Sequence, residues 1–238
     1  MAIRTTIRTV MTITMSITTT DTALLRLLQL SSASLPVGGY AFSQGLEYAI
    51  DTGWVKNFEQ TREWLSLQLM ESLAQVDCPL LLRCYRALQQ GDMEQLHYWN
   101  HYALACRETR ELRLTDTATG NALIRLLIQL QIEQPLEKSE ASFVTAFAIA
   151  AHHWQLSEEA AVLGLVWAWL ENQVAAATKL VPLGQTQAQQ LIGKIQQQVP
   201  AAITSATQLQ DFELGAGLPA LAIASAKHEH QYSRLFRS

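Results

Sequence analysis

From Ala23 onward, apolar residues recur at intervals of three and four, as in Leu65, Leu69, Leu73 and Val76. That spacing places them on one face of an α-helix. The long stretches between breaks consist mainly of Ala, Leu, Gln and Glu, which favour helix, while Gly and Pro mostly separate these stretches. The pattern predicts an all-α fold, with helices joined by short loops into a single compact helical bundle.

Glycine, proline and capping residues set the predicted helix ends. Gly53 suits the position after a helix, Ser157 is a good N-cap, and Pro182 interrupts any helix that reaches it. The predicted helices cover residues 22–31, 42–52, 59–76, 79–90, 93–106, 108–132, 141–153, 157–179 and 185–198. Beyond Pro200 the chain is expected to loosen, with a short helix from Leu221.

The two ends of the chain are expected to differ from the bundle. Residues 1–21 carry Arg4 and Arg8 with no acid before Asp21, as in a transit peptide, and residues 13, 15 and 17 alternate as in a strand. No later segment offers a strand for pairing, so a disordered leader is favoured, with Met11 or Met15 as alternative starts. Residues 22–238 are predicted to form one domain ending in a mobile tail at about 226–238.

Composition excludes several classes of function. The formal net charge of -4, with no long run of either sign, argues against nucleic-acid binding, which needs a basic surface. No apolar run reaches the roughly 20 residues of a membrane span, and residues 160–170 are expected to form a buried helix. Cys78, Cys84 and Cys106 are odd in number and irregularly spaced, which predicts reduced, buried thiols in a cytoplasmic protein.

No catalytic motif is present in the sequence. It lacks a phosphate-binding loop, a Gly-x-Gly-x-x-Gly motif and a His-Glu-x-x-His pair, so no catalytic residue, cofactor or resident metal is predicted. His97 and His101 share a helix face and could hold a metal with a third ligand from elsewhere, which leaves a metal-dependent helical enzyme as an alternative. His152 and His153 point apart, and His228 and His230 are expected to be exposed near the tail.

The segment 35–47 is the least ordinary in the chain, because a proline and a Gly-Gly turn precede a helix. On that helix Gln44, Glu47, Tyr48 and Asp51 fall on one side, opposite apolar residues. Two interpretations stay open: an ordinary amphipathic helix, or a rigid turn that presents Tyr40 and polar side chains to a partner. Two interpretations also stay open for Trp167 and Trp169: they lie in the core, which is favoured, or in an oligomer interface.

Four stretches, taken in order, resemble one known family. They are residues 27–47, which contain Leu-Leu-Gln-Leu-Ser-Ser-Ala-Ser and end in Gly-Leu-Glu; residues 110–113 with Gly120; residues 179–185; and residues 231–236. Together they resemble the urease accessory protein UreF family from about Ala23 to the end of the chain. The Thr-rich leader departs from the family pattern.

The resemblance implies a non-catalytic accessory protein with an all-α fold. Members of the family form homodimers, bind the accessory protein UreD (UreH in some species) and recruit the GTPase UreG, and this assembly delivers nickel to apo-urease. A UreF protein is also discussed as a regulator of GTP hydrolysis by UreG and as part of a nickel path. The alternative to this bridging role is a metal-dependent enzyme or a direct nickel carrier that uses His97 and His101.

The resemblance also implies partner-binding residues. Tyr40 and Arg234 match positions linked to dimerisation and UreG recruitment. Glu47 and Lys179 match positions linked to the UreG-facing surface and the control of GTP use. The tail, with Arg234, Leu235 and Phe236, matches a segment that becomes ordered when UreD binds; Gln44, on the polar side of its helix, completes the predicted partner-binding set.

Overall fold

Helix α7 (Phe143–His153) lies at the centre of the fold because its residues are small and apolar on every side. Residues 144–151 are all buried, and α7 packs against α4, α5, α6 and α8. The structure is a computed structural model that describes residues 21–136 and 140–238. The expected leader therefore lies outside the described residues, apart from Asp21, which begins the first helix.

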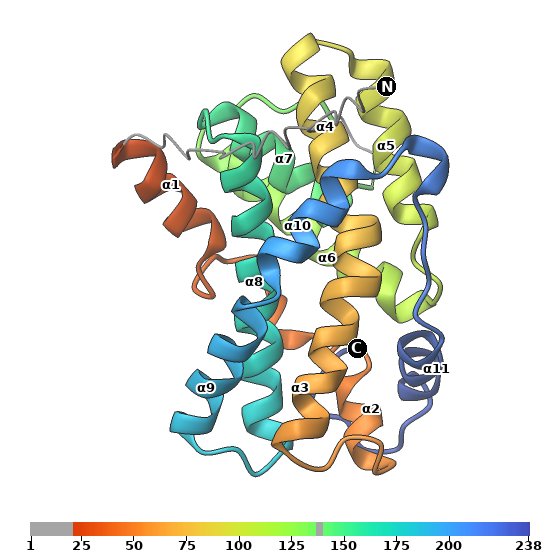
Figure 1. The fold of residues 1–238 in the computed structure, drawn as a ribbon. Helices are drawn as coiled ribbons and strands as arrows, with labels where there is room; N and C mark the ends of the chain where they lie inside the picture. Colours follow the sequence, from red (N-terminus) through yellow and green to blue (C-terminus); the bar gives the residue numbers. More distant parts are fainter. Residues whose placement is uncertain (1–20, 137–139) are drawn as a thin grey trace, which may run out of the picture.

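The described residues form helices and no strands, which confirms the predicted all-α bundle. Figure 1 shows α1 at one side of the bundle and α11 at the other. The α-helices are α1 (Asp21–Ser31), α2 (Leu46–Asp51), α3 (Phe58–Leu67), α4 (Cys78–Gln90), α5 (Met93–Ala105), α6 (Arg110–Gln129), α7, α8 (Glu158–Leu180), α9 (Gln185–Gln196), α10 (Val199–Gln208) and α11 (Pro219–His228). Short 3₁₀ turns cover Gly39–Ala41 and Asp211–Glu213.

The predicted break before Pro79 is absent. Helix α3 continues through π-helical turns at Gln68–Asp77 directly into α4. In the wider turns the N–H of Cys78 bonds to the carbonyl of Leu73, five residues back. Pro79 then stands in the first turn of α4, where a missing N–H costs little. Two predicted helices are therefore one continuous helical segment.

Helix α2 is shorter than the predicted 42–52. Gln44 and Gly45 have φ angles of 51° and 80°, which lie in the left-handed region and delay the helix to Leu46. A side chain at Gly45 would stand 3.1 Å from the backbone nitrogen of Ser225 on α11. The turn thus lets α11 approach α2 closely.

The prediction of a loosened chain beyond Pro200 is wrong for α10. Pro200 falls in the first helical turn, a position that proline tolerates, and α10 packs against the π-helical segment. The short helix predicted from Leu221 is present as α11, two residues longer at its start. It packs on α2 and α6.

Helix α8 is a core helix. Among the described residues it alone is long and apolar enough to cross a membrane by length and composition, and 67% of its apolar window is buried inside the molecule. Ser157 caps its start by accepting from the Ala160 N–H, as predicted, and the helix ends at Leu180 before Pro182.

Candidate functional site

The side chain of Glu47, on α2, holds the end of the chain in place. Its Oε1 atom accepts a hydrogen bond from the Leu235 backbone N–H at 2.7 Å, and its Oε2 atom accepts one from the Phe236 N–H at 3.0 Å. Glu47 is 5% exposed, and Phe236 is buried as well. We call residues 234–238 the tail segment; it docks on α2 through this one carboxylate.

A buried histidine links Glu47 to a second carboxylate. His228, at the end of α11, has no exposed surface, and its Nε2 and Nδ1 atoms lie 2.9 Å from Glu47 Oε2 and 2.8 Å from Glu111 Oε2. The other Glu111 oxygen accepts from Arg234 at 2.8 Å. Glu47, Glu111, His228 and Arg234 therefore form one network, which we call the tail cluster.

Two expectations about these residues are wrong. His228 was expected to be exposed and is fully buried, whereas His230 is exposed as expected. The sequence pattern groups Glu47 with other polar residues on the side of its helix opposite the apolar residues, yet Glu47 faces inward because the tail segment and His228 supply its contacts. The importance of Glu111 was missed, since a glutamate in the first turn of a helix ordinarily faces water beside the positive helix end.

Further contacts extend along the tail segment. Lys179 lies with its Nζ atom 5.5 Å from the ring centre of Phe236, a cation–π distance. The Arg237 N–H donates to the Ala41 carbonyl at 2.8 Å, and the Ser238 carbonyl accepts from Gln44 at 3.2 Å. The predicted residues Gln44, Glu47, Lys179, Arg234 and Phe236 are thus assembled at one place.

The docked tail segment leaves apolar side chains at the surface. Leu235 is 76% exposed, and Tyr40, which precedes the Ala41 carbonyl bound by Arg237, is 64% exposed. No hydrogen bond of the Tyr40 hydroxyl is present among the described residues. The mobility of the tail stays a prediction. In its docked position, the tail segment has a buried side chain at Phe236 and an exposed one at Leu235.

A cavity of about 130 Å³, lined by both polar and apolar side chains, adjoins the tail segment. Gln44 and Thr115 line it and also contact Ser238. Gln68 Nε2, Trp169 Nε1 and Gln173 Oε1 line the same cavity and have no hydrogen-bond partner among the described residues. These atoms can bind water or another small polar molecule. Trp169 thus lies against the core as favoured, whereas Trp167 is 36% exposed.

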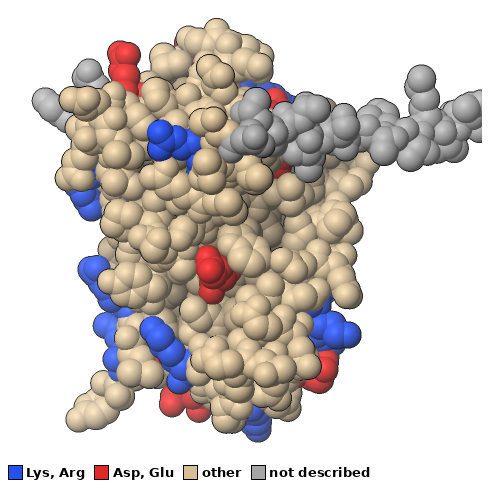
Figure 2. Space-filling model, turned by 90° about the vertical axis from the view of Figure 1, so that its left-hand side faces the viewer, with Lys and Arg blue, Asp and Glu red and all other residues tan. Residues whose placement is uncertain are grey.

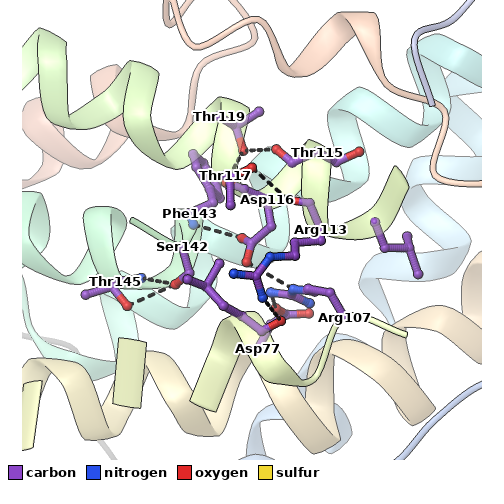
Figure 3. Close-up of polar contacts among 12 residues, drawn as sticks. Asp77, Arg107, Arg113, Thr115, Asp116, Thr117, Thr119, Ser142, Phe143 and Thr145 are labelled. Carbon is purple, nitrogen blue, oxygen red and sulfur yellow. Dashed lines mark hydrogen bonds and ion pairs between the residues drawn. The ribbon is translucent and has the colours of Figure 1, made fainter. Parts of the chain in front are cut away.

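A buried ion cluster fixes the helices beneath the cavity (Figure 3). Arg107 lies 2.6 Å from Asp77 and 3.1 Å from Asp116, and Asp116 also accepts from the Phe143 N–H at the start of α7. Burial raises the pKa of the Asp116 carboxyl, although Arg107 opposes the shift. Burial alone would lower the pKa of the Arg107 guanidinium, but the Asp116 and Asp77 carboxylates beside it outweigh that effect, and the pKa is raised. The cluster joins the π-helical segment to α6 and α7.

The histidine pair of the metal hypothesis lacks a third ligand among the described residues. His97 and His101 lie on α5, half-buried and exposed respectively, and residues 21–136 and 140–238 contain no group of three or more His, Cys, Asp or Glu side chains that could hold a metal. The cysteines are unpaired. Burial raises the pKa of Cys84 to about 12 and also raises that of Cys78, as expected for inert thiols.

Fold and site together define an all-α protein whose own chain end docks beside exposed apolar side chains. The family model of UreF matches residues 55–196. A urease accessory protein UreF of Marinomonas sp. (strain MWYL1) is 60% identical over 228 residues, covering 95% of this chain and 99% of the relative. Those of Teredinibacter turnerae and Pseudomonas entomophila are 50% and 48% identical, covering 90% and 92% of this chain and 98% and 99% of the relatives. The chain belongs to the urease accessory protein UreF family.

Proposed function

We propose that this chain is a cytoplasmic, non-catalytic scaffold that bridges UreD (UreH) and the GTPase UreG during delivery of nickel to apo-urease. Family membership supports the role in urease maturation. The bridging role, and any control of GTP hydrolysis by UreG, is inferred from the site. One observation carries it: the tail segment is anchored by buried polar contacts while Leu235 and Tyr40 stay exposed at 76% and 64%.

An anchored segment with exposed apolar side chains suits partner binding. The anchors fix the backbone before a partner arrives, so less conformational entropy is lost on association. Exposed Tyr and Leu side chains then supply contact area, and tyrosine is frequent among residues that dominate binding energy. Glu47 acts in this proposal by holding the tail segment, because its own side chain is covered.

A second apolar surface supports self-association into a homodimer. Leu24, Leu25 and Leu28 on α1 are 47%, 67% and 60% exposed. Figure 2, which views the side of the molecule that carries α1, shows few charged side chains over the middle of that face. Exposed apolar side chains on a face with few charges are typical of protein interfaces, and a two-fold dimer is the commonest closed arrangement.

The test is co-elution in size-exclusion chromatography with light scattering, first with UreD and then with GTP-loaded UreG. Arg234→Ala removes the ion pair with Glu111, and Leu235→Ala removes an exposed side chain while leaving its backbone bond to Glu47. Both variants are expected to lose assembly while keeping the helical circular dichroism of the wild type. Arg125→Ala, an exposed arginine on the same helix as Glu111, is the control and should assemble normally. Wild-type assembly by Arg234→Ala and Leu235→Ala would refute the proposal.

A further inference from the structure

The tail cluster contains a histidine with a carboxylate on each side of its ring. Each ring nitrogen of His228 faces a glutamate oxygen within 2.9 Å. A carboxylate oxygen can only accept, and a neutral imidazole carries one N–H and one acceptor nitrogen. A neutral ring would therefore direct a lone pair at one of the two carboxylates.

The other donors to the two glutamates come from the tail segment. Glu47 Oε1 and Oε2 accept from Leu235 and Phe236, and Glu111 Oε1 accepts from Arg234. Three of the four glutamate oxygens therefore accept from N–H groups outside His228, and Glu111 Oε2 faces His228 Nδ1. The arrangement is complete when both contacts of His228 contain a proton, as in an imidazolium between two carboxylates.

The charges agree with the hydrogen bonds. Two carboxylates, one guanidinium and one imidazolium sum to zero, so loss of the His228 proton leaves one uncompensated negative charge in a buried site. Such a charge is costly in a low-dielectric interior. The other charged groups near the cluster have different neighbours: Arg110 pairs with Glu229, Lys179 and Arg237 lie over Phe236 and Phe42, and Lys227 is exposed.

We propose that the tail cluster is a proton-dependent latch: the tail segment stays docked on α2 and α6 while His228 is an imidazolium, and it is released when His228 loses its proton. Release follows because Glu47 holds both His228 and the backbone of the tail segment. Glu111 holds the tail segment too, through Arg234. A neutral His228 leaves the cluster with a net negative charge, so as the pH rises its carboxylates favour solvent over the buried site. The backbone bonds of Glu47 to Leu235 and Phe236 then open together with the Glu111–Arg234 pair. The latch is a property of the lone chain and does not depend on the partners proposed above.

The test measures hydrogen exchange of the Leu235 and Phe236 amides in the purified full-length chain over a pH series. Protection factors are corrected for the intrinsic exchange rate at each pH, and the His228 ring is followed by NMR in the same samples. Both amides are expected to lose protection by at least about tenfold, equivalent to ~1.4 kcal/mol, in step with deprotonation of His228. The amide of Phe147, in the core, should stay protected throughout.

Two matched variants isolate the histidine. His228→Gln places one NH₂ group and one carbonyl oxygen between the two carboxylates and cannot titrate, so protection of the Leu235 and Phe236 amides should be low and should not change with pH. His230→Gln, two residues further and exposed, should retain the wild-type profile. If His228→Gln does not fold, the coincidence of the two wild-type transitions decides the question. Protection that stays constant while His228 titrates, or an equal loss in His230→Gln, overturns the latch.

Discussion

The Oε2 atom of Glu47 accepts a hydrogen bond from the Phe236 N–H at 3.0 Å, although the two residues are 189 positions apart in the chain. The same oxygen lies 2.9 Å from His228 Nε2. One buried carboxylate therefore joins the start of α2, the end of α11 and the tail segment. Its removal should affect both the stability of the fold and the position of the chain end.

Glu47→Ala should lower the free energy of unfolding by about 3 kcal/mol, because it leaves the buried His228 and two backbone N–H groups without their acceptor. Urea unfolding followed by far-UV circular dichroism measures the change. Glu71→Ala, at an exposed position of the π-helical segment, should change it by less than about 0.5 kcal/mol. Equal values for the two variants would contradict the structural role of Glu47.

The sequence was sufficient for the fold because helix formation depends on local spacing. The predicted 157–179 helix is α8 within one residue at each end, since a serine cap and a proline mark its limits. The same local rules fail between residues 76 and 79, where Pro79 indicates the start of a separate helix, and at Pro200, where proline indicates the end of the helices. Both prolines stand in a first helical turn, and proline suits a first turn as well as a loop.

The tail cluster could be predicted only in part. Family resemblance pointed to Glu47 and Arg234, but spacing alone could not show that Glu111 and His228 join them into one network, because the four residues lie on separate elements. Nothing local distinguishes buried His228 from exposed His230. Their difference arises when α11 packs on α2 and α6, which is a tertiary event.

Arg107→Gln should be among the more destabilising single changes in the chain. It leaves Asp77 and Asp116 facing each other without the guanidinium between them, which should lower the free energy of unfolding by about 3–5 kcal/mol at neutral pH. Chemical denaturation is the measurement. Arg86→Gln breaks the pair with Glu158, where the arginine is 48% exposed, and should cost under about 1 kcal/mol.

The loss of stability in Arg107→Gln, called the deficit below, should depend on pH through Asp116. Burial raises the pKa of its carboxyl, so its contribution to stability is full below the unfolded pKa and is lost as the pH rises through the folded pKa. Removing Arg107, which opposes the rise, should raise the folded pKa further. The deficit of Arg107→Gln relative to wild type should therefore shrink as the pH falls. A deficit that grows on acidification would show that Asp116 is not the controlling group.

The three thiols should differ in reactivity towards a disulfide reagent. Cys78 and Cys84 are buried, and burial raises the pKa of both thiols, so neither should react in the native chain at neutral pH. Cys106 is half-buried, and burial also raises its pKa, so it should react slowly and faster as the pH rises. Native Cys106→Ser should be unreactive, whereas the unfolded wild type should yield three thiols. Fast native reaction of Cys106→Ser would contradict the packing.

Gly120 is where α6 approaches the start of α7 most closely. A Cβ atom there would stand 2.2 Å from the Ala141 carbonyl oxygen and 2.7 Å from the Ser142 carbonyl carbon. Backbone atoms cannot move aside as a flexible side chain can, so Gly120→Ala should lower the free energy of unfolding by about 3 kcal/mol.

Gly193 provides the matched control, because it also lies inside a helix, α9, and a Cβ atom there would meet no other atom within 4 Å. Gly193→Ala should raise the free energy of unfolding by about 0.5–1 kcal/mol, since alanine restricts the unfolded chain and favours helix. Urea denaturation of the two variants and the wild type measures both the expected decrease for Gly120→Ala and the expected increase for Gly193→Ala in the free energy of unfolding. If Gly120→Ala also stabilises the fold, α6 does not approach the backbone of residues 141–143 this closely. The hydrogen bond from the Phe143 N–H to Asp116 on α6 would then be in doubt as well.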